Sequence, residues 1–335
     1  MDLTDQMLSA IEEDLKKQVK RCAEKPELEG LRAMIAYHMG WEGQGAGPEA
    51  RGKRLRPLLV TLCAAACGGD WHTSLPSASA VELVHNFSLL HDDIEDNSPL
   101  RRGRPTVWKL WGIPQAVNSG DAMFALAHLA IFDLLASVPS NITQQSCHIL
   151  QQTCLALTQG QYLDISFEHL SNVSVDAYWQ MISGKTAALL SCCCELGALA
   201  GGASSKITAA YARFGRNLGL AFQVLDDILG IWGDVALTGK SVESDLATGK
   251  KTLPVLYGLS QSGEFLTRWP TGIVPLTDVP WATQILLDMG AKDFTIHQAD
   301  RLTALALQAL SEANPAGQPA KELENLTRVL LQRKN

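Results

Sequence analysis

The sequence predicts an all-α protein. Hydrophobic side chains make up 46% of the 335 residues and charged ones only 19%, so the chain can bury a large core. Apolar residues recur at positions i, i+3 and i+4 over nearly the whole length, and no stretch alternates with period two between turn signals. Proline is absent from 140 to 253, which favours long helices in that span.

The first half of the chain contains five helix-periodic runs. The expected helices are Thr4–Lys20, Glu29–Met39, Arg56–Ala66, Pro76–Asp93 and Gln115–Ala136. Segments with glycine and proline, which end helices, fall at Gly40–Gly52, Gly68–Leu75 and Pro99–Pro105.

The second half contains seven such runs. They are Thr143–Glu168, Ser174–Gly201, Ile207–Ile231, Thr252–Leu259, Trp281–Met289, Lys292–Ala313 and Lys321–Lys334. The breaks Gly233–Lys251 and Ser260–Pro280 are too short to be long linkers, so we expect a single domain over 1–335.

The net charge of −7 excludes a general electrostatic hold on nucleic acid or on an acidic membrane surface. The most apolar run, Ala122–Val138, carries His128 and Asp133, so we expect no integral membrane segment. Five carboxylates in the first 20 residues argue against a signal peptide. The eight cysteines form no C-x-x-C pair, the spacing typical of redox and metal sites. The sequence therefore predicts a soluble cytoplasmic protein with reduced cysteines.

Two acidic clusters follow strongly apolar helical runs. Asp92 and Asp96 lie one turn apart on the same face of the expected helix, with Asp93 beside them. Asp226 and Asp227 form the second cluster. Either cluster alone could be a solvated helix end, but carboxylates at a helix C-terminus oppose the macrodipole and need a positive partner. Oxygen ligands of this kind indicate Mg²⁺.

Basic residues are concentrated in the glycine- and proline-marked breaks beside these clusters. They lie in Gly52–Pro57, in Arg101–Thr106, at Lys185, at Gly239-Lys240 and in Gly249–Thr252. Each could be an ordinary surface ion pair, but the joint pattern favours polyanion chemistry bridged by metal.

The order of these motifs resembles that of trans-type isoprenyl diphosphate synthases, also called polyprenyl synthetases. Three further segments belong to the same series: Gly160–Asp164, Lys185–Ala187 and Phe222-Gln223. The resemblance implies one all-α isoprenoid synthase domain of ten or more helices around a deep central cavity, normally a homodimer. Residues 1–45 would form N-terminal helices, 46–258 the catalytic motif core and 259–335 C-terminal helices. The implied reaction is ionisation of an allylic diphosphate, attack by the double bond of isopentenyl diphosphate, and proton loss to the released diphosphate.

The resemblance also implies roles for individual residues. About three Mg²⁺ ions would be bound by Asp92, Asp93, Asp96, Asp226 and Asp227. The allylic diphosphate (dimethylallyl, geranyl or farnesyl) would be bound by Arg101, Lys185, Thr186, Gln223, Lys240 and Lys250, and isopentenyl diphosphate by Lys53, Arg56, His85 and Arg102. The residues expected to be catalytic are Asp92, Asp93, Asp96, Lys185 and Asp226. Product length would be set by Val84, Phe87 and Ser88, a combination typical of enzymes that make geranylgeranyl or, less often, farnesyl diphosphate.

One position departs from the family pattern. Gly230 stands where the second motif usually has a third aspartate, and Asp234 could replace that carboxylate only in part. Gly230 keeps open a partner-dependent, non-catalytic subunit. A class I terpene cyclase of the same fold, a head-to-head condensing enzyme and a longer product also remain alternatives.

Overall fold

The computed structural model describes residues 2–168, 170–233 and 244–331, and it confirms the all-α prediction. The chain divides into two compact units. The N-terminal unit comprises Met1–Gln151, Cys192–Ala209 and Asn314–Leu323; the C-terminal unit comprises Gln152–Ser191, Ala210–Ala313 and Glu324–Asn335. The single domain expected from the sequence stays a prediction.

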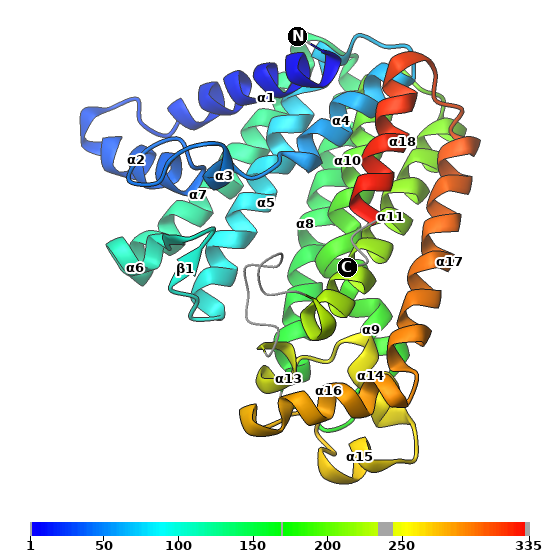
Figure 1. The fold of residues 1–335 in the computed structure, drawn as a ribbon. Coiled ribbons are helices and arrows are strands. Elements are labelled where there is room, and N and C mark those ends of the chain that lie inside the picture. The colour runs from blue at the N-terminus through cyan, green and yellow to red at the C-terminus, as the bar shows by residue number, and fades with distance from the viewer. Residues whose placement is uncertain (1, 169, 234–243, 332–335) are drawn as a thin grey trace. The chain divides into compact units, whose positions relative to one another are not determined.

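The N-terminal unit is built on α5, which packs along α7 and also contacts α4 and α1 (Figure 1). Its helices are α1 (Leu3–Lys20), α2 (Glu29–His38), α3 (Pro48–Arg51), α4 (Leu55–Ala66), α5 (Leu75–Glu95), α6 (Val107–Trp111) and α7 (Ile113–Phe132), with short helices η1 (Pro26–Leu28), η2 (Trp71–Ser74) and η3 (Asp133–Ala136). Ile11, Leu59, Leu83 and Met123 are fully buried on four of these helices and form part of the core.

Local signals explain several helix starts. The side chain of Asp2 accepts a hydrogen bond from the Asp5 amide at 2.7 Å and caps α1. Pro48, Pro76 and Pro114 lie in the first turns of α3, α5 and α7, where a missing amide hydrogen costs nothing. The Asp2 cap and these prolines therefore set where α1, α3, α5 and α7 begin.

A small antiparallel hairpin follows α5, although the sequence predicted no strand. Strands β1 (Leu100–Arg101) and β2 (Arg104–Pro105) pair Arg101 with Arg104. The two turn residues between them, Arg102 and Gly103, have φ of 51° and 72°, the conformation favoured by tight hairpins. Strands of two residues carry too little alternation to be detected in a sequence.

The C-terminal unit contains α9 (Val175–Ile182), η4 (Ser183–Ala187), α13 (Ser244–Thr248), α14 (Leu253–Ser260), α15 (Glu264–Arg268), η5 (Leu276–Asp278), α16 (Val279–Asp288) and α17 (Ala291–Glu312). Four helices give residues to both units: α8 (Ser140–Glu168), α10 (Ala188–Ala200), α11 (Ser205–Trp232) and α18 (Gly317–Leu331). A buried cluster around Ile231, Leu246, Val255 and Phe265 joins α11, α13, α14 and α15.

The run Ser174–Gly201, expected as one helix, contains a π-helical segment, η4, at Ser183–Ala187. Helix α8 approaches this segment very closely. A Cβ atom on Gly160 would lie 2.1 Å from the backbone nitrogen of Lys185, so only glycine fits there. Single-turn π segments are often found at functional sites, and this one contains Lys185 and Thr186.

Two segments in the described part of the chain, Ile113–Ala136 and Val175–Ala200, are long and apolar enough to cross a membrane by length and composition. Core helices of globular proteins pass the same test, and 44% and 61% of the respective windows are buried. All eight cysteines are free thiols, and five of them are buried.

Candidate active site

The first acidic motif ends α5 and divides into an outer pair and an inner residue. Asp92 is partly exposed and Asp96 is exposed, one turn apart. Asp93 is 1% exposed, and its Oδ1 accepts a hydrogen bond from Arg101 Nε at 2.8 Å. Its Oδ2 is buried and has no hydrogen-bond partner in the part of the chain that the structure describes. Burial raises the pKa of Asp93, while the charge of Arg101 opposes that rise.

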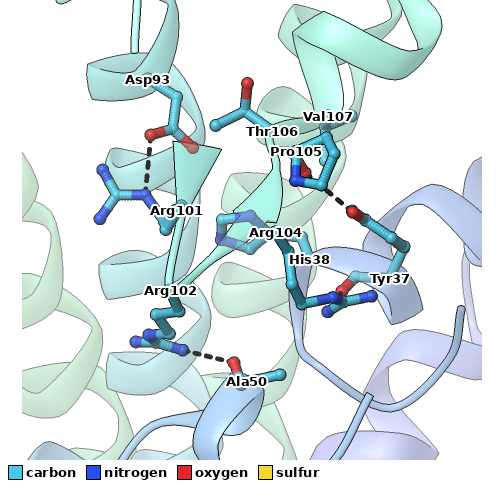
Figure 2. A pocket seen from close by; sticks show the side chains of 10 residues that line it. All are labelled: Tyr37, His38, Ala50, Asp93, Arg101, Arg102, Arg104, Pro105, Thr106 and Val107. Atoms are coloured by element: carbon cyan, nitrogen blue, oxygen red, sulfur yellow. Dashed lines mark hydrogen bonds and ion pairs between the residues drawn. The ribbon is translucent and has the colours of Figure 1, made fainter. Parts of the chain in front are cut away.

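The hairpin places Arg101 at the end of β1 and Arg102 in its turn (Figure 2). Arg102 Nη1 donates to the carbonyl oxygen of Ala50 at 2.8 Å. A Cβ on Gly52 would lie 2.7 Å from Arg102 Nη2, so the guanidinium lies directly against the glycine of the first basic motif. Arg101, Arg102 and Asp93 line a cavity of about 20 Å³, the size of one water molecule.

Arg54 is the buried, ion-paired residue of the first basic motif. Its side chain is 3% exposed and lies between two carboxylates, with Nε 2.6 Å from Glu12 and Nη1 2.8 Å from Glu82. Its φ of 47° is unusual for a residue other than glycine. These contacts hold the turn from which Lys53 and Arg56 extend.

Arg56 and His85 are joined directly, with 3.1 Å between Nη1 and Nε2. A guanidinium can only donate, so Nε2 of His85 accepts and the ring proton is on Nδ1. Burial and the nearby positive charge of Arg56 lower the pKa of His85 well below its ordinary value, so the ring is neutral. Three of the four residues expected to bind isopentenyl diphosphate, Arg56, His85 and Arg102, therefore belong to buried or part-buried polar contacts, and Lys53 is exposed.

His38 was missed by the sequence reasoning. It lines the same cavity as Arg101 and Arg102 (Figure 2). Its Nε2 is buried and has no hydrogen-bond partner among the described residues. Burial, followed by the charges of Arg101, Arg102, Arg54 and Arg104, lowers the pKa of His38 to about 3. No local pattern marks this histidine, because the arginines that surround it come from distant motifs.

A neutral buried histidine makes the stability depend on pH. Because the pKa of His38 is lowered from 6.5 to about 3, its contribution is complete above 6.5 and is lost as the pH falls toward 3. Between pH 7 and pH 5 this one group should reduce the free energy of unfolding by about 2 kcal/mol. In urea unfolding, the fall in the free energy of unfolding between pH 7 and pH 5 should be smaller by this amount in His38→Gln than in the wild type. His148→Gln, at an exposed site, should show the same fall as the wild type. An equal pH dependence in both variants would contradict this assignment.

In the C-terminal unit, the expected allylic-site residues form one network. Lys185 is paired with Asp164 of α8. The hydroxyl of Thr186 donates to Gln223 Oε1 at 2.7 Å, and Gln223 Nε2 donates to Asp227 Oδ1 at 3.1 Å. The network thus joins the π-helical segment to α11.

Asp227 is the buried end of this network. Its Oδ2 accepts from the hydroxyl of Tyr178 at 2.7 Å and from the amide of Leu253 at 2.9 Å. Burial raises the pKa of Asp227 to about 7, although these hydrogen bonds oppose that rise. Both oxygens are therefore engaged by the protein. Tyr178 is a second residue that the sequence reasoning missed.

Asp226, next to Asp227, is exposed on α11, and Lys250 is partly exposed after α13. Lys240 and Asp234 lie outside the described residues. Among the described residues, no three His, Cys, Asp or Glu side chains gather closely enough to form a metal site by themselves.

The expected chain-length residues lie on α5 before Asp92. Val84 is fully buried, and the hydroxyl of Ser88 donates to the carbonyl oxygen of His85. The ring of Phe87 packs edge-on against Phe124 of α7, with centroids 5.1 Å apart, and against His91 at 5.7 Å. Phe87 therefore faces α7.

The sequence matches the family described as polyprenyl synthetase over residues 47–268. The chain belongs to the polyprenyl synthetase family. Two relatives from Mycobacterium tuberculosis (strain ATCC 25618 / H37Rv) are similar over most of their length. A geranylgeranyl diphosphate synthase is 42% identical over 85% of this chain and 83% of the relative, and a (2E,6E)-farnesyl diphosphate synthase is 37% identical over 90% and 86%.

Solved polyprenyl synthetases share the fold. The crystal structure of a polyprenyl synthetase from Streptomyces coelicolor A3(2) has a TM-score of 0.86 and 34% identity and covers 98% of both chains. The structure of a geranylgeranyl pyrophosphate synthetase from Pyrococcus horikoshii Ot3 has a TM-score of 0.87, with 30% identity over 98% of this chain and 97% of the other. The isoprenoid synthase fold expected from the motifs is confirmed.

Proposed function

We propose that this protein is a Mg²⁺-dependent prenyltransferase that condenses isopentenyl diphosphate with an allylic diphosphate to give a short-chain trans-prenyl diphosphate, most simply geranylgeranyl diphosphate. The observation that carries the proposal is the N-terminal unit's combination of the outer pair Asp92 and Asp96 with the basic contacts of Arg56, His85 and Arg102. Carboxylates for a metal and cations for a diphosphate are the two needs of this reaction.

The acidic residues fit Mg²⁺ bound together with a diphosphate. Mg²⁺ in proteins is usually held by one or two carboxylates plus substrate phosphates, and each motif offers a small number of accessible carboxylates. Asp92 and Asp96 of the first motif and Asp226 of the second would be the metal ligands. Asp93 and Asp227 would be positioning residues, because their oxygens contact other protein groups or are buried. When bound, Mg²⁺ would neutralise the allylic diphosphate so that it can leave.

The chain's cations would orient the two substrates. Arg101, Lys185 and Lys250 would contact the allylic diphosphate, and Lys240 joins them on the sequence pattern alone. Lys53, Arg56, His85 and Arg102 would bind the diphosphate of isopentenyl diphosphate. Neutral His85 donates from Nδ1, which suits a phosphate oxygen.

The reaction would then proceed in three steps. The bond between the allylic carbon and its diphosphate oxygen breaks, the double bond of isopentenyl diphosphate attacks that carbon, and a proton is lost to the released diphosphate. His85 does not suit the role of base, because it is already protonated on Nδ1 and accepts from Arg56 on Nε2.

A primer-by-primer assay tests the proposal. The protein is incubated with labelled isopentenyl diphosphate, Mg²⁺ and each of dimethylallyl, geranyl and farnesyl diphosphate in turn. Elongated diphosphates that require Mg²⁺ are expected. Absence of elongation with every primer would refute the proposal. Hydrocarbon formed from an allylic diphosphate alone would indicate a cyclase, and activity only with an added chain would indicate a partner-dependent subunit.

Phe87→Ala should lengthen the product by at least one isoprene unit. The truncation removes a ring that packs against Phe124 and opens space below Asp92 on the same helix. Chromatography of the dephosphorylated products measures the shift. Leu307→Ala, at an exposed position of α17, is the control and should leave the distribution unchanged. An unchanged distribution in Phe87→Ala would remove this residue from the chain-length pocket.

We also propose a cytoplasmic homodimer. Exposed apolar side chains recur along α7 and η3 at Ile113, Val117, Phe124, Leu129, Phe132 and Leu135. Repeated exposed apolar side chains on one helical segment favour an interface, and a second copy of the chain would cover them. Sedimentation equilibrium measures the oligomeric state.

A further inference from the structure

Arg104 is a buried cation to which the proposed function gives no substrate contact. It lies on β2 and is 8% exposed. Its Nε donates to the carbonyl oxygen of Gln44 at 2.9 Å, Nη1 to that of Tyr37 at 2.8 Å and Nη2 to that of Glu42 at 2.7 Å. A guanidinium is a rigid planar fork of donors, so one arginine can hold several carbonyl groups in a fixed geometry. Arg104 therefore ties the hairpin to the end of α2 and to the irregular loop of residues 40–47 that follows it.

The ring of Tyr37 covers the guanidinium. Cζ of Arg104 lies 3.9 Å from the ring centroid, a cation–π contact. The hydroxyl of Tyr37 donates to the carbonyl oxygen of Pro105 at 2.8 Å, so a second bond joins α2 to β2 (Figure 2). The loop packs on the same ring, since a Cβ atom on Gly43 would lie 2.6 Å from Cδ2 of Tyr37. Arg104, Tyr37 and the loop thus form one packed unit.

Loop 40–47 offers little apolar surface of its own. Residues 43–46 are Gly, Gln, Gly and Ala, and all four are exposed. Trp41 fixes the start of the loop, because its Nε1 donates to Glu12 at 2.7 Å. After Trp41 the sequence gives the loop no large apolar side chain to bury. The path of the loop therefore depends on its polar backbone contacts, and Arg104 holds two of its carbonyl groups.

The loop leads into the first basic motif and lies against the segment that carries it. A Cβ atom on Gly40 would lie 2.5 Å from the carbonyl carbon of Ala50, so the start of the loop contacts the backbone of α3. The carbonyl oxygen of Ala50 also accepts from Arg102 Nη1 at 2.8 Å. The hairpin therefore holds the segment at both ends, through Arg104 before α3 and through Arg102 within it. Lys53 follows two residues after α3.

We propose that Arg104 is a positioning residue for isopentenyl diphosphate. By holding loop 40–47 against the hairpin, it sets where the first basic motif presents Lys53 and Arg56. The inference rests on the proposed function, which assigns these two side chains to the diphosphate of isopentenyl diphosphate. Arg104 acts through the backbone, because its three nitrogens bond carbonyl groups of the protein.

Arg104→Lys tests the proposal in steady-state kinetics with the preferred primer. Lysine keeps the positive charge, but an ammonium group cannot hold three carbonyl groups in the geometry of the planar fork. The KM for isopentenyl diphosphate should rise by about 10-fold, because small displacements of substrate-binding groups are costly. Both kcat and the KM for the primer should stay within about twofold of the wild type, the pattern of lost ground-state binding to one substrate.

A second variant perturbs the loop without changing the arginine. Gly43 has φ of 82° and lies against Tyr37, so Gly43→Ala should displace the loop and raise the same KM. Gln44→Ala is the matched control, because Arg104 bonds the carbonyl oxygen of Gln44 and not its exposed side chain. Arg213→Lys, at an exposed site of α11, controls for the arginine-to-lysine change. Both controls should behave as the wild type.

Two measurements that need no turnover complete the test. Isothermal titration with isopentenyl diphosphate alone should show affinity about 10-fold weaker in Arg104→Lys than in the wild type. Hydrogen exchange followed by mass spectrometry should show faster exchange of the amides of residues 41–47 in Arg104→Lys and in Gly43→Ala, and wild-type exchange in Gln44→Ala. Thermal unfolding of each variant shows whether the protein is folded, and Gly43→Ala decides the case if Arg104→Lys does not fold.

A wild-type KM for isopentenyl diphosphate in Arg104→Lys would overturn the inference. So would an equal rise in the KM of both substrates together with a fall in kcat, because that result indicates general damage to the site. A wild type that elongates no primer would refute the proposed function instead, and the hydrogen exchange would still show whether Arg104 holds the loop.

Discussion

Asp92→Asn is expected to reduce kcat by about a thousandfold while the protein remains folded. Asparagine keeps the size and shape of the side chain but removes the negative charge that would hold Mg²⁺ against the leaving diphosphate. Asp92 is partly exposed at the end of α5, so its charge contributes little to the core. Steady-state kinetics with isopentenyl diphosphate and the preferred primer measure the loss.

The matched control is Asp5→Asn, an exposed carboxylate in the first turn of α1. It makes the same chemical change at a position that is distant in the sequence from the acidic and basic motifs, so kcat should be unchanged. A wild-type kcat in Asp92→Asn would remove this residue from the metal site. Circular dichroism must show equal helix content in both variants for the comparison to hold.

Arg54→Met is expected to lower the free energy of unfolding by about 3–5 kcal/mol. The arginine side chain is 3% exposed, and Glu82, one of its two carboxylate partners, is 4% exposed. Removal of the guanidinium leaves Glu82 buried without its charge partner and also removes the bond to the carbonyl oxygen of Met39 at 3.1 Å. Urea unfolding monitored by circular dichroism measures the change.

A comparison with Arg32→Met controls for the loss of an arginine as such. Arg32 also bonds two glutamates, Glu29 and Glu42, but both carboxylates are largely exposed, so the cost should be below about 1 kcal/mol. Adding Glu12→Gln and Glu82→Gln to Arg54→Met should recover part of the stability, because the buried charges are then gone. Equal costs for Arg54→Met and Arg32→Met would contradict the prediction.

Most of the helices could be predicted from the sequence, because an apolar stripe at helical spacing needs only local information. Long runs such as Thr143–Glu168 differ from the observed α8 by only a few residues at one end. The failures have a common cause. The π-helical segment within Ser174–Gly201 depends on the close approach of Gly160 from another helix, and the hairpin at Arg102-Gly103 has strands of only two residues.

The expected site residues were predicted by motif type, but their individual tasks depend on contacts. Asp93 and Asp227 look like their neighbours in the sequence, yet both are buried and bonded to protein groups, whereas Asp226 and Asp96 are exposed. His38 gave no signal because its pKa is lowered by burial and by the charges of arginines that are distant in the sequence.

The sequence by itself determined the all-α class, the family and the set of charged residues, because helical periodicity and short motifs are local properties of a chain. Only the tertiary structure decided which carboxylates are buried, which histidines are neutral, and that three carbonyl groups converge on Arg104. Burial and close approach depend on segments far apart in the sequence. Their energies exist only once the chain has folded.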